Sequence, residues 1–160
     1  MPTQPDRIDD LVGQWRGERP DLDLETMATV GRVLAVAQRW LAAIEEHARE
    51  HGIDRGQGDV LFTLRRSGEP YRLSPSRLAA STLVSSGTMT NRLDRLERLG
   101  LVTRLANPGD RRGMDVALTA EGLALADEAV SRHVAREQEM LAPLSARERE
   151  QLDRLFRKLL

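Results

Sequence analysis

Residues 74–119 constrain the fold more than any other stretch of this 160-residue chain. Ser74-Pro75 is a helix start signal, with serine as N-cap and proline at the first helical position. A short helix to about Ser81 follows, then an apolar turn and a second helix capped by Ser85 or Ser86. Two β-leaning runs then flank Asn107-Pro108-Gly109 and predict a hairpin. This order is typical of a helix-turn-helix followed by a wing, which places one helix in a DNA major groove.

The rest of the chain is predicted to be mostly helical. Apolar residues at three- and four-residue spacing predict a long amphipathic helix from Leu24 to about His51, stopped by Gly52. Residues 1–23, before this helix, are polar and contain Trp15. The further elements are expected to be a helix over 57–66, strands over 71–73, 101–105 and 114–118, a helix from Thr119 to about Leu141, and a last helix opened by the capping box Ser145–Glu148.

We therefore predict a mainly α fold with a small β-hairpin: a winged helix-turn-helix with N- and C-terminal dimerisation helices. Residues 1–56 form the N-terminal segment and dimerisation helix, 57–119 the DNA-binding module, and 120–160 the C-terminal dimerisation helices, all within one compact domain. The terminal helices have apolar faces that a winged module of this size does not cover. Because exposed apolar area is costly, a second copy of the chain is expected to bury them in a symmetric homodimer.

Composition excludes several classes of protein. The chain has no cysteine, so thiol chemistry and disulfides are ruled out. Its apolar runs are far too short for a membrane span and its first 23 residues too charged for a secretory signal, so we expect a cytoplasmic protein without a membrane partner. No phosphate-cradling glycine loop and no nucleophile–base arrangement is present, so we predict no catalytic residues, no cofactor and no enzymatic activity.

Charge is distributed unevenly along the chain. The net charge is −1 overall, but between Arg65 and Arg112 ten basic residues face four acidic ones. That segment carries +6, so the remaining residues together carry −7. A basic segment in an acidic frame matches an electrostatic footprint for phosphate that is confined to one module, although chance clustering on a solvated face also produces it.

The second helix of the predicted module divides into two faces at 100° per residue. Met89, Leu93 and Leu96 point toward the module, while Thr88, Asn91 and Arg95 lie on the opposite side, free to enter a groove. Asn91 suits adenine edges, and Arg95 suits guanine or phosphate. The helix N-terminus favours a phosphate, and the wing arginines suit the minor groove or backbone. The predicted contacts to double-stranded DNA are Arg72, Ser74, Arg77, Ser85, Ser86, Gly87, Thr88, Thr90, Asn91, Arg95, Asp110, Arg111 and Arg112, with Asp110 orienting the two wing arginines.

Four motifs resemble the multiple antibiotic resistance regulator (MarR) family. They are the helix from Ser86 to Glu97, the segment Gly100-Leu101-Val102, the wing sequence Asp110-Arg111-Arg112-Gly113, and Leu118-Thr119-Ala120-Glu121-Gly122. The helical ends fit the dimerisation region of that family, so the resemblance covers nearly the whole chain. It implies a homodimer that binds a pseudo-palindromic operator, mostly as a repressor, and that is usually released by a small ligand.

Trp15 and the Glu18–Asp23 segment resemble a branch of this family that responds to urate or related anionic metabolites. The resemblance implies a ligand pocket formed by Trp15, Asp59 and Arg92; other members of the family respond to carboxylates. Guanidinium and indole suit a planar anion, and a group bound to Arg92 can tilt the second helix of the module. Asp59 can pair with Arg92 until the ligand competes. The alternative is that Asp59 caps a helix or forms a salt bridge, that Arg92 contacts phosphate, and that Trp15 packs the N-terminal segment against the rest of the protein. Some members of the branch carry an extra N-terminal helix, whereas only about 23 residues precede the first long helix here.

Two other functions compete with this interpretation. His47 and His51 are four residues apart, a spacing compatible with Zn²⁺, and Glu50 and Asp54 lie nearby, which suggests a metal-responsive regulator or a pH-responsive seam. The sequence fixes no third ligand, so we predict no metal site. The second alternative is a helical interaction module that binds no DNA, but such a module does not need arginines at the tip of a hairpin.

Overall fold

The computed structural model describes residues 4–107 and 110–160, without the side chains of residues 110–112. The chain forms two compact units, Met1–Ala43 (unit 1) and Ile44–Leu160 (unit 2). The long helix α2 (Leu24–Glu50) contributes to both units and ends where predicted, because Gly52 follows with a φ of 71°. Among the described residues, no helix is both long and apolar enough to cross a bilayer.

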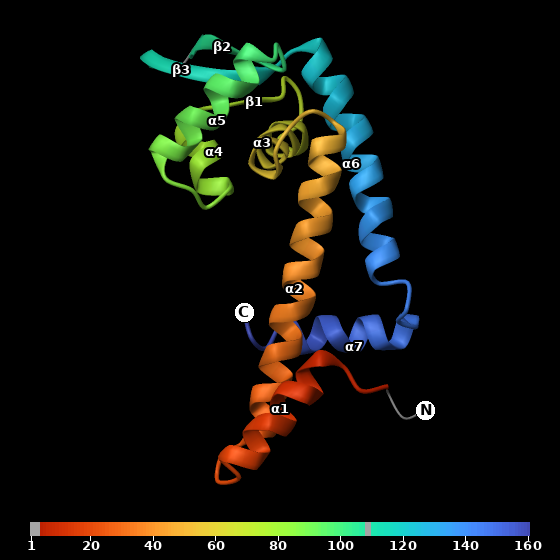
Figure 1. The fold of residues 1–160 in the computed structure, drawn as a ribbon. Helices are drawn as coiled ribbons and strands as arrows, with labels where there is room; N and C mark the ends of the chain where they lie inside the picture. Colours follow the sequence, from red (N-terminus) through yellow and green to blue (C-terminus); the bar gives the residue numbers. More distant parts are fainter. Residues whose placement is uncertain (1–3, 108–109) are drawn as a thin grey trace. The chain divides into compact units, whose positions relative to one another are not determined.

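Unit 1 contains a helix, α1 (Arg7–Glu18), that the sequence analysis did not predict (Figure 1). Asp6 caps α1 in a capping box in which Asp9 takes the place usually held by glutamate or glutamine. Arg32 of α2 binds both carboxylates, at 2.8 Å from Asp6 and 2.5 Å from Asp9. The segment before α2 is therefore mostly helical. Ile8, Leu11, Val12 and Trp15 recur at three- and four-residue spacing, a helix signal that the prediction overlooked.

Unit 2 follows the predicted order of elements closely (Figure 1). The capping residues Ser74, Ser85, Thr119 and Ser145 all accept a hydrogen bond from the first turn of the helix that they open. This confirms the predicted helix starts. The elements are α3 (Arg55–Arg66), β1 (Arg72–Leu73), α4 (Pro75–Ser81), α5 (Ser86–Arg98), β2 (Val102–Asn107), β3 (Asp110–Leu118), α6 (Ala120–Met140) and α7 (Ala146–Phe156).

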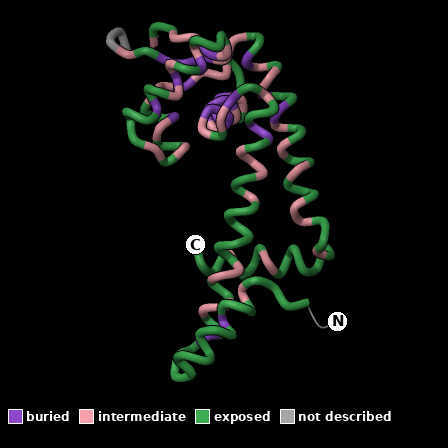
Figure 2. The backbone as a smooth tube through the Cα atoms, in the orientation of Figure 1, coloured by how far each residue is buried: buried purple, intermediate pink, exposed green. Residues whose placement is uncertain are grey.

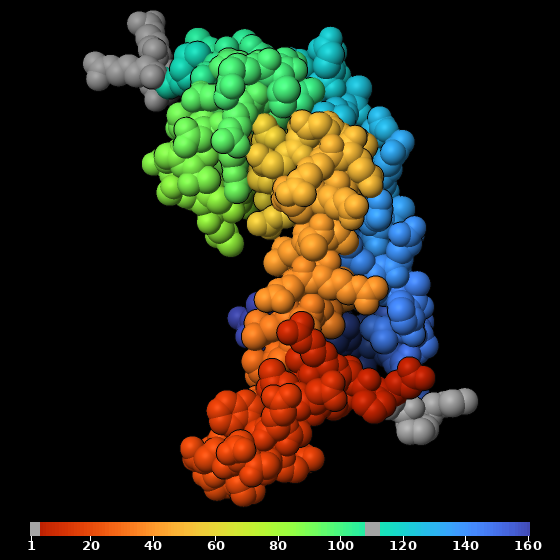
Figure 3. All heavy atoms as spheres, viewed as in Figure 1, coloured from red at the N-terminus to blue at the C-terminus, as the bar shows by residue number. Residues whose placement is uncertain are grey.

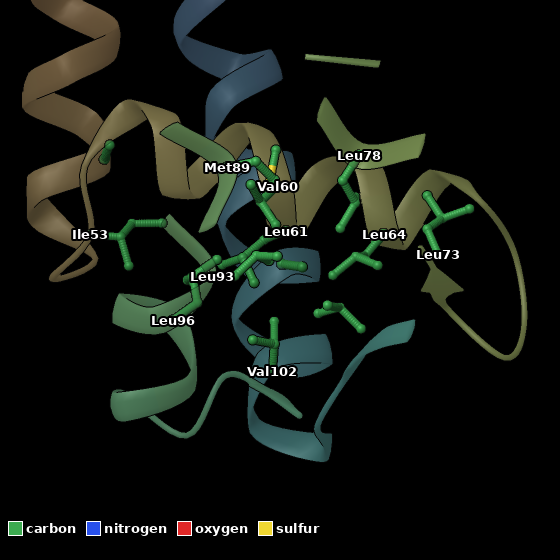
Figure 4. Close-up of a cluster of buried hydrophobic side chains, with 13 residues drawn as sticks. Ile53, Val60, Leu61, Leu64, Leu73, Leu78, Met89, Leu93, Leu96 and Val102 are labelled. Atoms are coloured by element: carbon green, nitrogen blue, oxygen red, sulfur yellow. The ribbon is translucent and has the colours of Figure 1, made fainter. Parts of the chain in front are cut away.

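The core of unit 2 is built around α3, where the buried backbone gathers in Figure 2. Val60, Leu61 and Leu64 are fully buried in α3, and Figure 4 shows the first two beside Met89 and Leu93 of α5. The core consists of aliphatic side chains and one methionine, as the scarcity of aromatic residues requires. Because α3 contacts α4, α5, α6 and β3, it fixes the positions of the helix-turn-helix and the wing.

The wing is a three-stranded antiparallel sheet in the order β1-β3-β2. The predicted hairpin strands are confirmed but extend further toward the tip, where Asn107 pairs with Asp110 after an irregularity at Ala106. The predicted short strand before α4 is β1, whose Arg72 and Leu73 pair with Ala117 and Val116 of β3. The sheet therefore joins the segment before the helix-turn-helix to the wing.

Candidate nucleic-acid interface

The helix-turn-helix is formed by α4, a tight turn and α5. Val84 in the turn is half-buried against the core, whereas Leu83 has a φ of 53° and is exposed. The N–H of Thr88 donates to the hydroxyl of the N-cap Ser85 at 3.3 Å, so the first turn of α5 is well ordered. Gly87 has no heavy atom within 4 Å of the position that a Cβ would take, which leaves the α5 N-terminus open. That end of the helix is the part expected to approach a phosphate.

The two predicted faces of α5 are confirmed. Met89, Leu93 and Leu96 are at most 2% exposed, whereas the outer face is accessible. Figure 3 shows the side chains of α4 and α5 at the surface of unit 2. The exposed members of the predicted DNA contacts on α4 and α5 are Arg77, Ser85, Ser86, Gly87, Thr88, Thr90, Asn91 and Arg95, while Ser74 is half-buried.

Arg95 is exposed on this outer face and lies in the last turn of α5. It lies 3.5 Å from Asp54, the N-cap of α3, and its side chain is 61% accessible. An ion pair this open contributes little to stability. The guanidinium can therefore leave Asp54 for a phosphate or a base edge at low cost.

Arg72 occupies a different environment from the one that the sequence suggested. Its Nε donates to Asp115 at 2.9 Å and a terminal nitrogen donates to the carbonyl of Ala106, and its side chain is only 19% accessible. These bonds hold β1 against the other two strands. A contact between Arg72 and a DNA phosphate would require these hydrogen bonds to break, so the DNA contact of Arg72 stays a prediction. The signal missed in the sequence was the acidic Asp115 on a buried strand position.

The tip of the wing is only partly described. The backbone of Asp110 pairs with Asn107, but the side chains of Asp110, Arg111 and Arg112 lie outside the described residues. Their predicted roles in the groove remain predictions.

Arg104 of β2 was not singled out in the sequence but connects the wing to α5. It donates to Asp94 at 2.5 Å and to Glu97 at 2.8 Å, and the hydrogen bond to Asp94 raises the pKa of the guanidinium. Asp94 and Glu97 lie on the side of α5 toward the wing. The two bonds from Arg104 therefore couple the orientation of α5 to the position of the β2–β3 hairpin.

The predicted pairing of Asp59 with Arg92 is present but loose. Nη1 of Arg92 lies 3.9 Å from Asp59, within ion-pair range but beyond hydrogen-bond distance. This nitrogen is buried and has no hydrogen-bond partner. Arg92 also lines a surface hollow of about 340 Å³. Its other lining residues are Glu45, Asp54, Arg55, Gly56, Thr88, Asn91 and Arg95. Trp15 belongs to unit 1, so its place in a shared pocket remains a prediction.

All three histidines of the chain lie together in unit 2. The ring centroid of His47 is 4.9 Å from that of His51 and 6.1 Å from that of His133 on α6. They line a cavity of about 50 Å³, and His47 Nε2 lies 3.2 Å from the carbonyl of Ala129. Within the described part of the chain, no three histidine, aspartate or glutamate side chains are placed to hold a metal ion. The cavity has room for a few water molecules, which would satisfy the remaining ring nitrogens.

Comparison with known proteins places this geometry among transcriptional regulators. A model of the MarR family matches residues 51–113. The regulator PecS of Dickeya dadantii is 39% identical over 149 residues, which cover 93% of this chain and 90% of PecS.

Two solved structures are similar over most of their length. A mutant of Escherichia coli MarR complexed with operator DNA gives a TM-score of 0.72 at 29% identity, covering 91% of this chain and 97% of the other. The second structure is that of BpsR of Bordetella bronchiseptica, whose DNA binding is regulated by 6-hydroxynicotinic acid. It gives a TM-score of 0.69 at 28% identity, covering 81% of this chain and 91% of BpsR.

Proposed function

The chain belongs to the MarR family of transcriptional regulators, and from this we propose that it binds a pseudo-palindromic operator in double-stranded DNA as a homodimer. We propose further that it acts as a repressor and that a small anionic ligand releases it from the DNA. Residues 57–119 form the DNA-binding module in this proposal. Residues 1–56 and 120–160 supply the dimerisation helices.

The observation that carries DNA binding is the division of α5 into a buried face and an open polar face. Thr88, Asn91 and Arg95 stand on the open face, and the uncovered N-terminus of α5 lies beside them. This is the pattern needed for base contacts from the middle of a helix and a phosphate contact at its start. The MarR structure with operator DNA supports this role, since it is similar over nearly its whole length.

Exposed apolar side chains support the homodimer. In unit 1, Val30, Val33, Leu34 and Leu41 on α2 are each 43–57% exposed. In unit 2, Leu155 of α7 and the following Leu159 are 48% and 78% exposed. Exposed apolar side chains in such numbers mark an interaction surface, and a second copy of the chain carries the matching one. Two copies of α5 related by a two-fold axis then meet half-sites about 10 bp apart.

Arg92 is the residue that we propose receives the effector, with Asp59 as its ion-pair partner when no effector is bound. The Arg92 side chain lines an open hollow, and its ion pair with Asp59 at 3.9 Å is longer than a hydrogen bond, so an oxyanion that enters the hollow can make a shorter contact with the guanidinium. The regulation of BpsR by 6-hydroxynicotinic acid supports a planar, acidic ring as the class of effector.

The remaining parts of the proposal concern what the protein does not do and where it acts. The relatives named above are regulators of transcription, which supports a protein without catalytic activity. We propose that it acts in the cytoplasm, where its DNA lies, and that it needs no cofactor.

The test is binding to duplexes selected from a random pool, followed by fluorescence anisotropy at several salt concentrations. Arg95→Ala should weaken binding by about 5-fold or more, since a specific polar contact to a base is worth about 1–3 kcal/mol. If Arg95 contacts a phosphate, the slope of log affinity against log salt should also fall by about 0.9. Arg147→Ala on α7 is the control and should change neither quantity. Absence of any selected duplex that wild type prefers over random competitor contradicts the proposed function.

A further inference from the structure

Two glycines, Gly56 and Gly58, lie in the first two turns of α3. Glycine in a helix is less favourable than alanine, and neither residue has the positive φ that would require it. A Cβ on Gly58 would meet only Ile53 Cδ1, at an ordinary contact distance of 3.8 Å. The reason for glycine at position 56 must therefore be sought in its surroundings.

The space beside Gly56 is filled by the guanidinium of Arg92. A Cβ at position 56 would lie 2.5 Å from Nε, 2.6 Å from Cζ and 2.7 Å from Nη2. A Cβ essentially never makes non-bonded contacts this short, so any other residue at position 56 requires the guanidinium, the flexible end of the Arg92 side chain, to move. The Arg92 guanidinium therefore packs directly against α3 in the space that a side chain at position 56 would occupy.

The contact with Gly56 matters because Arg92 Nη1 is buried without a hydrogen-bond partner among the described residues. Asp59 lies 3.9 Å away, beyond hydrogen-bond distance. The side chain is only 19% accessible and lies against α3 at Gly56. On its open side it lines the hollow shared with Thr88, Asn91 and Arg95 of the DNA-facing surface.

We propose that Gly56 is a positioning residue for effector recognition: it seats the Arg92 guanidinium against α3, oriented to take a planar oxyanion. This inference rests on the proposed function, in which Arg92 binds the effector. Recognition of a carboxylate by a guanidinium depends on a fixed orientation of the planar group. A methyl group at position 56 removes that orientation without removing any charge.

The first experiment is a thermal double-variant cycle on the full chain at one protein concentration, and it needs neither effector nor DNA. Gly58→Ala is the matched control and should raise Tm by about 2–4 °C, the gain expected when alanine replaces glycine in a helix. Gly56→Ala should give a similar rise when Arg92 is already alanine, but no rise, or a fall, when Arg92 is present. An equal rise in both backgrounds overturns the proposal.

Whether the variants fold also distinguishes a clash with Arg92 from some other defect in α3. If Gly56→Ala does not fold, the Gly56→Ala/Arg92→Ala variant should restore folding, because the clash is then absent. Failure of both variants to fold contradicts the proposal, since the cause would lie elsewhere in α3.

The second experiment measures release from DNA by urate and by 6-hydroxynicotinate. Gly56→Ala should raise the half-maximal concentration of an active anion at least 10-fold, while Gly58→Ala leaves it unchanged. An unchanged response of Gly56→Ala overturns the positioning role. If wild type responds to neither anion, this choice of effector in the proposed function fails, and the thermal cycle still decides whether Gly56 seats Arg92.

Discussion

Gly122→Ala tests the joint between the wing and α6. A Cβ on Gly122 would lie 1.9 Å from the carbonyl oxygen of Leu101 and 2.8 Å from its carbonyl carbon. Both are backbone atoms, so no side-chain rotation relieves the clash. To restore even a short contact of 3.0 Å, the first turn of α6 must move away from Leu101 by roughly 1 Å.

The cost follows from what that movement breaks. Thr119 donates through its backbone N–H to Leu101 at 3.2 Å and through its hydroxyl to Gly100 at 2.7 Å. Two hydrogen bonds contribute about 1–3 kcal/mol together, and strain from overpacking costs about the same if the helix stays in place. These are alternatives, and alanine regains up to about 1 kcal/mol of helix propensity. Once that gain is subtracted, we expect a net loss of up to about 2 kcal/mol in the free energy of unfolding.

Urea unfolding followed by circular dichroism measures this loss. At an m-value of about 2 kcal/mol/M, the midpoint should fall by up to about 1 M with the slope unchanged. Gly87→Ala is the control, since nothing lies within 4 Å of its Cβ position, and its midpoint should stay the same or rise. A Gly122→Ala midpoint as high as that of Gly87→Ala refutes the close approach of α6 to Leu101.

Three further predictions concern charged residues. Arg72→Ala should lower the free energy of unfolding in urea by about 1–3 kcal/mol, because the buried Asp115 carboxylate in β3 loses its cationic partner. Arg77→Ala on the exposed face of α4 is the control and should leave the stability unchanged, and equal stabilities of the two variants would contradict a structural role for Arg72. Arg104→Ala should weaken DNA binding in anisotropy measurements because α5 loses its ion pairs to the wing, although Arg104 is not among the predicted DNA contacts. Unchanged affinity would show that these ion pairs do not orient α5. The hydrogen bond from Arg32 lowers the pKa of Asp6 below its ordinary value of 3.8, so the α1–α2 contact should be constant above about pH 4 and weaken as pH falls through that lowered value. Fluorescence of Trp15 against pH in a Trp40→Phe background, compared with Asp6→Asn, measures this, and an identical profile in both would contradict it.

Local chemistry explains which parts of the fold were predictable from the sequence. A serine or threonine N-cap acts on the three residues that follow it, so the starts of α4, α5, α6 and α7 were visible in the chain itself. The buried face of α5 was equally visible, because helical periodicity alone decides that Met89, Leu93 and Leu96 point the same way. The helix α1 was equally readable, since Asp6 is an N-cap and Ile8, Leu11, Val12 and Trp15 follow helical spacing, but the prediction overlooked it.

The functional geometry depended on pairs of residues far apart in sequence. Nothing near Gly56 indicates that Arg92 of α5 fills its missing side chain, and nothing near Arg72 indicates Asp115. The gathering of His133 with the two histidines of the α2 end likewise required the packing of α6. The sequence alone determined the elements, their faces and the family, because caps and periodicity act over a few residues. Only the tertiary structure decided that Arg92 packs against Gly56, that Arg72 is bound within the sheet and that Arg95 stays accessible for DNA, because those outcomes depend on packing between elements.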